Sequence, residues 1–268
     1  MKYLFILIIA LIIILICIII YYLKKENLYN EKSNEKEINL YTGAGAYRLG
    51  DGFYLTDYKD VWIKSDKNNV TKNYESLSKL IKLFPNSILA EYLKLSNFKA
   101  EKYDILLKIV KNRFKKDNLV NKKTDCLLHL RVGDVIDELC NKENFVNKFY
   151  HNITKVDFDN NIRCNYIKPL SYFIDKIKIL HRLNIKKIYI ICGAHIKLKN
   201  YNYSIYYIKK IKNIFNDAKI DVILKIANHP DIDLLFSMNF DYFIPSNGQY
   251  SRLILDVNKK INYNFKIL

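Results

Sequence analysis

The stretch TDCLLHLRVGDVID, residues 124–137, decides the fold class of this chain. Its apolar residues from Cys126 to Leu128 predict a buried strand, and a few polar residues and a glycine turn follow directly. This pattern is typical of a parallel strand at its carboxyl end, and ligands of open α/β sheets bind at that edge. We therefore expect a ligand site where this strand ends.

Four residues carry the chemistry of this expected site: His129, Arg131, Gly133 and Asp134. The planar guanidinium of Arg131 suits a phosphate group, and Gly133 lets the backbone turn sharply or approach a ligand closely. A His-Arg-Asp group in this place can equally be a structural ion pair that caps a loop. The residues by themselves leave both interpretations open.

Strands and helices alternate from Pro169 onward, and this alternation predicts a parallel sheet of the Rossmann type. The expected helices are residues 170–183, 204–215, 230–238 and 250–258, and the expected strands are 187–192, 220–226 and 242–244. Upstream, apolar spacing predicts helices at 74–84, 87–95 and 102–116, whereas the polar residues 139–168 are expected to form a long loop.

Two further strand ends are expected at the same edge as Arg131. One is at residues 193–195, where His195 follows the strand, and the other is at residues 246–251. Ser251 lies near a helix N-terminus, where a hydroxyl and nearby N–H groups suit a phosphate. Taken alone, an ordinary helix start is the simpler explanation of Ser251.

A glycine-rich segment at residues 38–60 is a second candidate for binding an anion. It contains Gly43, Gly45 and Arg48. Backbone N–H groups in such a segment can face an anion, and a nearby Arg can reach a ligand. A tight turn or hairpin explains the glycines equally well.

The composition describes a folded, basic protein. The chain has 268 residues, of which 50% are hydrophobic and 26% charged, so it can form one large domain or two small ones. Its net charge of +17 suits an anionic partner, such as a nucleic acid, a membrane surface or an anionic substrate. The basic residues are scattered, and AT-rich codons favour lysine, so a dedicated nucleic-acid surface is not expected.

An uncharged apolar run at residues 3–23 predicts a transmembrane helix. At a rise of 1.5 Å per residue, it spans roughly 30 Å, the thickness of a hydrocarbon core. A cleaved signal peptide is the alternative, but small residues would follow it, whereas KKE follows here. We expect a single-pass anchor in the lipid bilayer at residues 1–25 and a stem at 26–37. Lysines flank both ends, so orientation stays open, with a Golgi or ER lumen-facing domain as one option.

The cysteines give no sign of a metal site. Cys126 and Cys192 lie in apolar runs and are expected to be buried thiols, whereas Cys140 and Cys164 can pair if the domain is lumenal. The sequence has neither a CxxC pair nor a His/Cys cluster with the spacing of a metal site, so we expect no metal.

Two motifs together resemble the fucosyltransferase-like superfamily, especially the α-1,2-fucosyltransferases. HLRVGD at residues 129–134 is similar to the family's His-x-Arg-x-Gly-Asp signature. DLLFSMNFDYFIPSNGQYS at residues 233–251 is similar to its Asp-Leu…Met…Ile…Asn-Ser-Ser-Phe-Ser segment in order and approximate spacing. More loosely, GAGAYRLGD at residues 43–51 resembles the glycine-rich loop near the start of those enzymes.

The resemblance implies an abridged GT-B-like architecture and an inverting, metal-independent glycosyltransferase. The donor would be a nucleotide-sugar, GDP-fucose, and the acceptor a hydroxyl of a glycan or glycoprotein. Residues 124–268 would form the Rossmann-like donor half, and residues 38–123 an abridged acceptor half. No cofactor beyond the GDP-fucose co-substrate is implied.

The same resemblance assigns roles by motif position. Arg131 would hold the β-phosphate, His129 would shape the donor site, and Asp233 would reach the base or ribose. A general base must take the proton of the acceptor hydroxyl. Asp134 and His195 are the candidates for that base. The remaining donor-site residues would be Gly133, Asn247, Tyr250, Ser251, Gly43, Gly45 and Arg48.

Two departures from the family pattern keep other functions open. Val132 stands where many relatives have a second Arg, and CGAH at residues 192–195 stands where they have Ser-Asp-Asp. One alternative is therefore a non-catalytic relative that binds a carbohydrate or a nucleotide. Another, motivated by the net charge of +17, is a membrane-tethered protein that binds nucleic acid or anionic lipid.

Overall fold

The structure is a computed structural model, and it describes residues 38–43, 49, 53–54, 62–66, 69–75, 82, 84–95, 102–138, 140, 142–152 and 166–268. The chain divides into two compact units, Met1–Ile38 and Asn39–Leu268, and the elements named below belong to the second. The expected anchor and stem, together with Gly45, Arg48 and Cys164, lie outside the described residues. Within the described part, no helix is both long enough and apolar enough to cross a bilayer.

Five parallel strands form the central sheet, in the order β5-β4-β3-β6-β7. Along the chain, β4 and β5 are added on one side of β3, and β6 then pairs with its other side. The strand order therefore reverses between β3 and β6, which is the topological switch point where doubly wound sheets bind their ligands. The strands are β3 (Asp125–Arg131), β4 (Lys187–Gly193), β5 (Asp221–Ile226), β6 (Tyr242–Ile244) and β7 (Lys266–Ile267).

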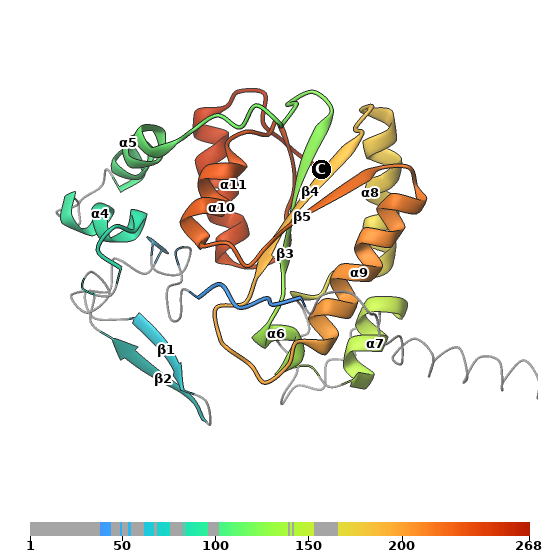
Figure 1. The fold of residues 1–268 in the computed structure, drawn as a ribbon, viewed down its shortest axis with the longest axis horizontal. Helices are drawn as coiled ribbons and strands as arrows, with labels where there is room; N and C mark the ends of the chain where they lie inside the picture. The colour runs from blue at the N-terminus through green and yellow to red at the C-terminus, as the bar shows by residue number, and fades with distance from the viewer. Residues whose placement is uncertain are drawn as a thin grey trace, which may run out of the picture. The chain divides into compact units, whose positions relative to one another are not determined.

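Helices cover both faces of this sheet. On one face lie α8 (Leu170–Arg182) and α9 (Asn202–Asp217), and on the other lie α10 (Pro230–Ser237) and α11 (Gln249–Ile261) (Figure 1). Because both faces are covered, every residue of β3 except Arg131 is buried. Covered parallel strands read as continuous apolar runs, which is why the sequence reveals them. The predicted α/β class with a parallel, Rossmann-like sheet is confirmed.

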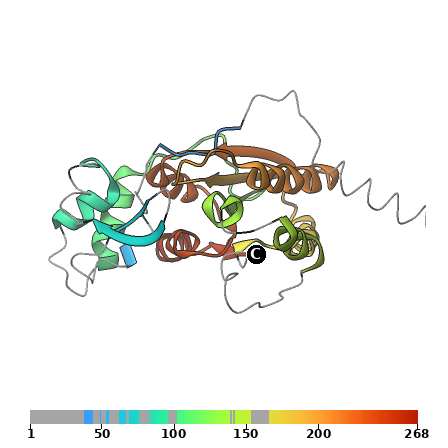
Figure 2. The same ribbon diagram turned by 90° about the horizontal axis from the view of Figure 1, so that it is seen from below.

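The turn that leaves β3 is tightly packed at the carboxyl edge of the sheet. It leads into the short helix α6 (Asp134–Asp137), the green helix near the middle of Figure 2. Gly133 adopts a φ of +86°, and a Cβ built on it would lie 2.7 Å from the Cβ of Ala194. Ala194 is fixed in turn, because its N–H donates to the Leu40 carbonyl (2.7 Å) and its carbonyl accepts from Thr42 (3.0 Å). The turn therefore has no room for a side chain at position 133.

The residues before the sheet form an antiparallel hairpin and two helices. β1 (Trp62–Asp66) pairs with β2 (Asn69–Glu75), and α4 (Ile88–Leu95) and α5 (Lys102–Arg113) confirm two predicted helices. The helix predicted over residues 74–84 is wrong at its start, because its first two residues pair with β1 instead. The sequence of β2 contains Val70, Thr71 and Tyr74, and β-branched and aromatic residues favour strands.

The loop predicted over residues 139–168 is also wrong in part, because it contains helix α7 (Lys142–His151). Phe145 and Phe149, one helical turn apart, are the buried residues of α7, and Phe145 stacks on Tyr203 of α9 with 5.5 Å between ring centroids. Two apolar residues in a polar segment are enough for a helix once a neighbouring helix covers them.

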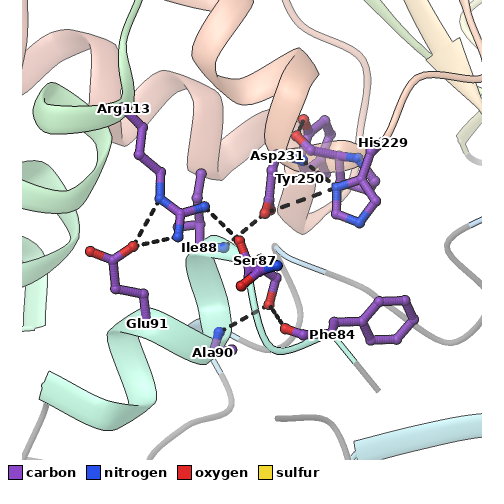
Figure 3. A network of polar contacts seen from close by, with 11 residues as sticks. Phe84, Ser87, Ile88, Ala90, Glu91, Arg113, His229, Asp231 and Tyr250 are labelled. Atoms are coloured by element: carbon purple, nitrogen blue, oxygen red, sulfur yellow. Dashed lines mark hydrogen bonds and ion pairs between the residues drawn. The ribbon is translucent and has the colours of Figure 1, made fainter. Parts of the chain in front are cut away.

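Helix α4 is fastened to α10 through its N-terminus (Figure 3). The Asp231 carboxylate of α10 accepts a hydrogen bond from the N–H of Ile88 (2.7 Å), and the Ser87 hydroxyl accepts from the N–H three residues later (3.1 Å). Both contacts satisfy backbone donors that a helix start leaves unpaired, and the carboxylate also suits the helix dipole. Arg113 of α5 bonds Glu91 of α4 (2.8 Å from Nε to Oε2), which ties the two helices together.

We expect Gly133→Ala to lower the free energy of unfolding by about 2–4 kcal/mol, because alanine is strained at this φ and overlaps Ala194. Gly43→Ala is the matched control. Its φ is +70°, but nothing lies within 4 Å of the added Cβ, so only about 1 kcal/mol of backbone strain is expected. Urea unfolding of the two full-length variants measures the difference, and equal losses would contradict a tight contact with Ala194.

Candidate functional site

Three candidate residues from two strand ends meet at the carboxyl edge. Nη2 of Arg131 donates to Oδ1 of Asp134 (3.2 Å), and Nδ1 of His195 lies 3.5 Å from Arg131 Nη1 and 3.8 Å from Asp134 Oδ1. Arg131 is 21% exposed and Asp134 10% exposed, so the pair is largely withdrawn from water. The register explains the meeting, because Arg131 lies opposite Gly193 and His195 follows two residues later.

The ion pair with Asp134 leaves most of the Arg131 guanidinium to a ligand. A guanidinium carries five N–H donors in a planar fork. Among the described residues, only Asp134 and His195 lie within hydrogen-bonding distance of it. Arg131 can therefore cap the loop and still offer donors to an anion. The two interpretations that the sequence leaves open are compatible in this geometry.

The buried side chain of His129 connects the elements that meet at the switch point. Nδ1 of His129 lies 2.6 Å from the Ser251 hydroxyl and 3.0 Å from the Ser246 hydroxyl, so β3, the end of β6 and the start of α11 are joined at one atom. Burial, and secondarily the charge of Arg131, lowers the pKa of His129 to about 3. The imidazole is therefore neutral near pH 7. The Ser251 hydroxyl, which the sequence suggests as a phosphate ligand, points inward to this ring.

Asn247 and Tyr250 lie beside the His129 contacts and bond to different elements. The Oδ1 of Asn247 accepts a hydrogen bond from Nζ of Lys168 (2.8 Å), which lies just before α8. The ring of Tyr250 packs edge-on against His129 with 5.3 Å between centroids, and its hydroxyl donates to the Pro230 carbonyl at the start of α10. Tyr250 therefore holds α10 and α11 together beside the site.

Asp233 is bonded to a different partner from the Arg131 group. It is buried in the first turn of α10, and its Oδ1 accepts a hydrogen bond from the Asn228 amide (2.9 Å). Burial raises the pKa of Asp233 to about 7, against the lowering effects of Asn228 and Lys225. Among the described residues, it makes no hydrogen bond or ion pair with Arg131, Asp134 or His195.

Of the three candidates in the glycine-rich segment at residues 38–60, the structure describes Gly43. It is exposed, with a φ of +70°. Gly45 and Arg48, the other candidates of that loop, lie outside the described residues. No group of three or more His, Cys, Asp or Glu side chains in the described ranges is arranged to hold a metal ion.

The sequence gives no warning of two residues that hold the turn after β3. The hydroxyl of Ser204 accepts the N–H of Gly133 (2.9 Å) and donates to the Asp137 carboxylate. Asp137 also accepts the N–H of Tyr203 (2.8 Å) and so caps the start of α9. A serine and an acidic residue near helix starts are visible in the sequence, but their pairing across 67 residues is not. The sequence likewise does not reveal the pairing of Lys168 with Asn247, which lie 79 positions apart.

Comparisons with known proteins give a limited likeness. No protein-family model and no curated protein matches this chain. The crystal structure of POFUT1 in complex with GDP-fucose matches with 11% identity and a TM-score of 0.37, over 60% of this chain and 46% of that chain. The structure of POFUT1 in complex with GDP matches with 10% identity and a TM-score of 0.33, over 58% and 47%. The matched region thus spans less than half the length of the POFUT1 chains.

The lowered pKa of His129 predicts how stability depends on pH. Below pH 6.5, the ordinary pKa of histidine, His129 is protonated in the unfolded chain. In the folded chain it stays neutral down to about pH 3. The contribution of His129 to the free energy of unfolding should therefore fall by about 1.4 kcal/mol per pH unit as the pH drops from 6.5. We expect the stability of the wild type relative to His129→Gln to decrease in this way between pH 6.5 and 4. Urea unfolding at several pH values measures it, and a difference that does not vary with pH would refute the assignment.

Proposed function

We propose that this chain is a fucosyltransferase-like glycosyltransferase that binds GDP-fucose at the carboxyl edge of its parallel sheet. One observation carries the proposal: the Arg131 guanidinium is fixed at the end of β3, beside the switch point, with most of its donors left over. The resemblance of residues 129–134 and 233–251 to the fucosyltransferase motifs supplies the donor class. In this proposal Arg131 binds the β-phosphate.

The start of α11 is the second element of the proposed donor site. It follows β6 through Gly248, whose φ of +104° allows a close backbone approach. A helix N-terminus at this position suits an anion through its N–H groups and dipole. His129, Tyr250 and Ser251 then support the site from below by fixing this helix end, while Asn247 borders it.

The proposed reaction inverts the sugar at its anomeric carbon. The acceptor hydroxyl forms the new C–O bond as the C–O bond to the β-phosphate breaks, and the diphosphate leaves with the electron pair. A fixed guanidinium stabilises the negative charge that develops on that leaving group. The hydroxyl proton passes to Asp134 or His195, which lie 3.8 Å apart beside Arg131.

The proposal extends to the setting of the enzyme. Residues 3–23 would anchor it in the bilayer, with residues 26–37 as a stem, residues 38–123 facing the acceptor and residues 124–268 holding the donor. Cys140 is disulfide-bonded, which supports a Golgi or ER lumen-facing domain, because disulfides persist in oxidising compartments. The acceptor would be a hydroxyl of a glycan or glycoprotein.

Donor binding by the purified full-length chain tests the proposal first. GDP and GDP-fucose should raise its Tm, whereas UDP, CDP and their sugars should not, because a ligand that binds only the folded state stabilises it. GDP binding without hydrolysis or transfer would indicate a non-catalytic relative. Steeply salt-dependent binding of nucleic acid or anionic vesicles, without any response to nucleotides, would replace the proposal by a polyanion-binding function.

Replacing Arg131 tests its role in the donor site. We expect Arg131→Gln to weaken GDP binding by about tenfold to a hundredfold, because charge-assisted hydrogen bonds to phosphate are lost. Arg131→Lys should lie between, since it keeps the charge but loses the planar fork. Arg182→Gln, at an exposed position in the last turn of α8, is the control. Titration calorimetry measures all three, and unchanged affinity in Arg131→Gln would sink the assignment.

A further inference from the structure

The turn between β6 and α11 is contacted from both faces of the sheet. On the α11 side, the Ser246 hydroxyl lies 3.0 Å from His129, two residues before Arg131 in β3. On the α8 side, the hydroxyl of Tyr172 donates to the Pro245 carbonyl (3.1 Å), and Nζ of Lys168 donates to the neighbouring Asn247 side chain (2.8 Å). Lys168 therefore places a cation beside the same turn that His129, two residues before Arg131 in β3, contacts through Ser246.

Lys168 is held firmly in this position. Its backbone N–H donates to the hydroxyl of Tyr207 (3.0 Å), and that hydroxyl donates back to the Lys168 carbonyl (3.2 Å). Its ammonium lies 5.2 Å from the centre of the Tyr172 ring and bonds the Asn247 amide oxygen. An ammonium has three donors, so the amide leaves two of them for a ligand.

The surroundings of this ammonium are electropositive. In the described ranges, no carboxylate lies within ion-pair distance of Lys168, whereas Lys148 of α7 and Lys176 of α8 are close enough to act on it. Burial first, and then these two charges, lowers the pKa of Lys168. A half-buried cation among like charges is costly by itself, and an anion bound beside it would relieve that cost.

We propose that Lys168 is the second cation of the donor site and binds the terminal phosphate of the nucleoside diphosphate together with Arg131. This inference rests on the proposed function. A departing diphosphate carries more than one negative charge, and one guanidinium that already shares a hydrogen bond with Asp134 neutralises it only in part. Lysine is a compact point charge that suits the oxygen atoms of a phosphate. Asn247 then acts as a positioning residue that aims the ammonium.

Titration calorimetry of the full-length chain with GDP and GMP tests the proposal. We expect Lys168→Gln to weaken GDP by about tenfold or more, because a charged hydrogen bond to the terminal phosphate is lost. The affinity for GMP should change by less than about threefold, because GMP lacks the phosphate that Lys168 would bind. Lys168→Arg should retain most of the GDP affinity. The matched control is Lys178→Gln on α8, whose side chain is 69% exposed and should not matter.

Three results would overturn the proposal: no change for GDP in Lys168→Gln, an equal loss for GDP and GMP, or the same loss in Lys178→Gln. Inorganic pyrophosphate separates this proposal from the proposed function. If the wild type binds no nucleotide, the proposed donor fails. Pyrophosphate binding that Lys168→Gln abolishes would still support a diphosphate site at Lys168. Pyrophosphate binding that is absent, or equal in both chains, would refute it.

Discussion

The contact of His129 with two serine hydroxyls is the interaction on which the rest of the site depends. It joins the central strand to both ends of the β6–α11 turn, within 3.0 Å of a single ring nitrogen. Because that nitrogen is buried, an unpaired partner would be costly, and the start of α11 has little freedom to move away from β3. Arg131 lies two residues further along the same strand, so the guanidinium and the anchored helix start belong to the same edge of the sheet.

Much of the fold could be predicted because the strands of a parallel sheet covered on both faces have continuous apolar sequences. The strands β3 to β6 and the helices from α8 to α11 follow from such runs and from the spacing between them. The end of β2, where residues 74–75 were expected to begin a helix, could not be foreseen, since pairing with β1 outweighs local spacing there. Helix α7 is not predicted from the sequence, because only Phe145 and Phe149 are buried in an otherwise polar segment.

The candidate site was accessible to prediction only where residues follow a strand end. Arg131, Asp134 and His195 are found that way, because parallel strands bring their carboxyl ends to one edge. Lys168 and Ser204 come from helix starts far along the chain, and no local pattern pairs them with Asn247 or Gly133. Side-chain direction is a further limit: Ser251 lies where expected, but its hydroxyl faces His129.

The capping of α4 by Asp231 has a consequence for biosynthesis. The donor and the acceptor of that hydrogen bond are 143 positions apart, and the acceptor is the later of the two. A ribosome therefore releases α4 long before the carboxylate that completes its first turn exists. Short helices without tertiary partners are marginal in water. The first turn of α4 therefore gains its carboxylate cap only after most of the parallel sheet has been translated.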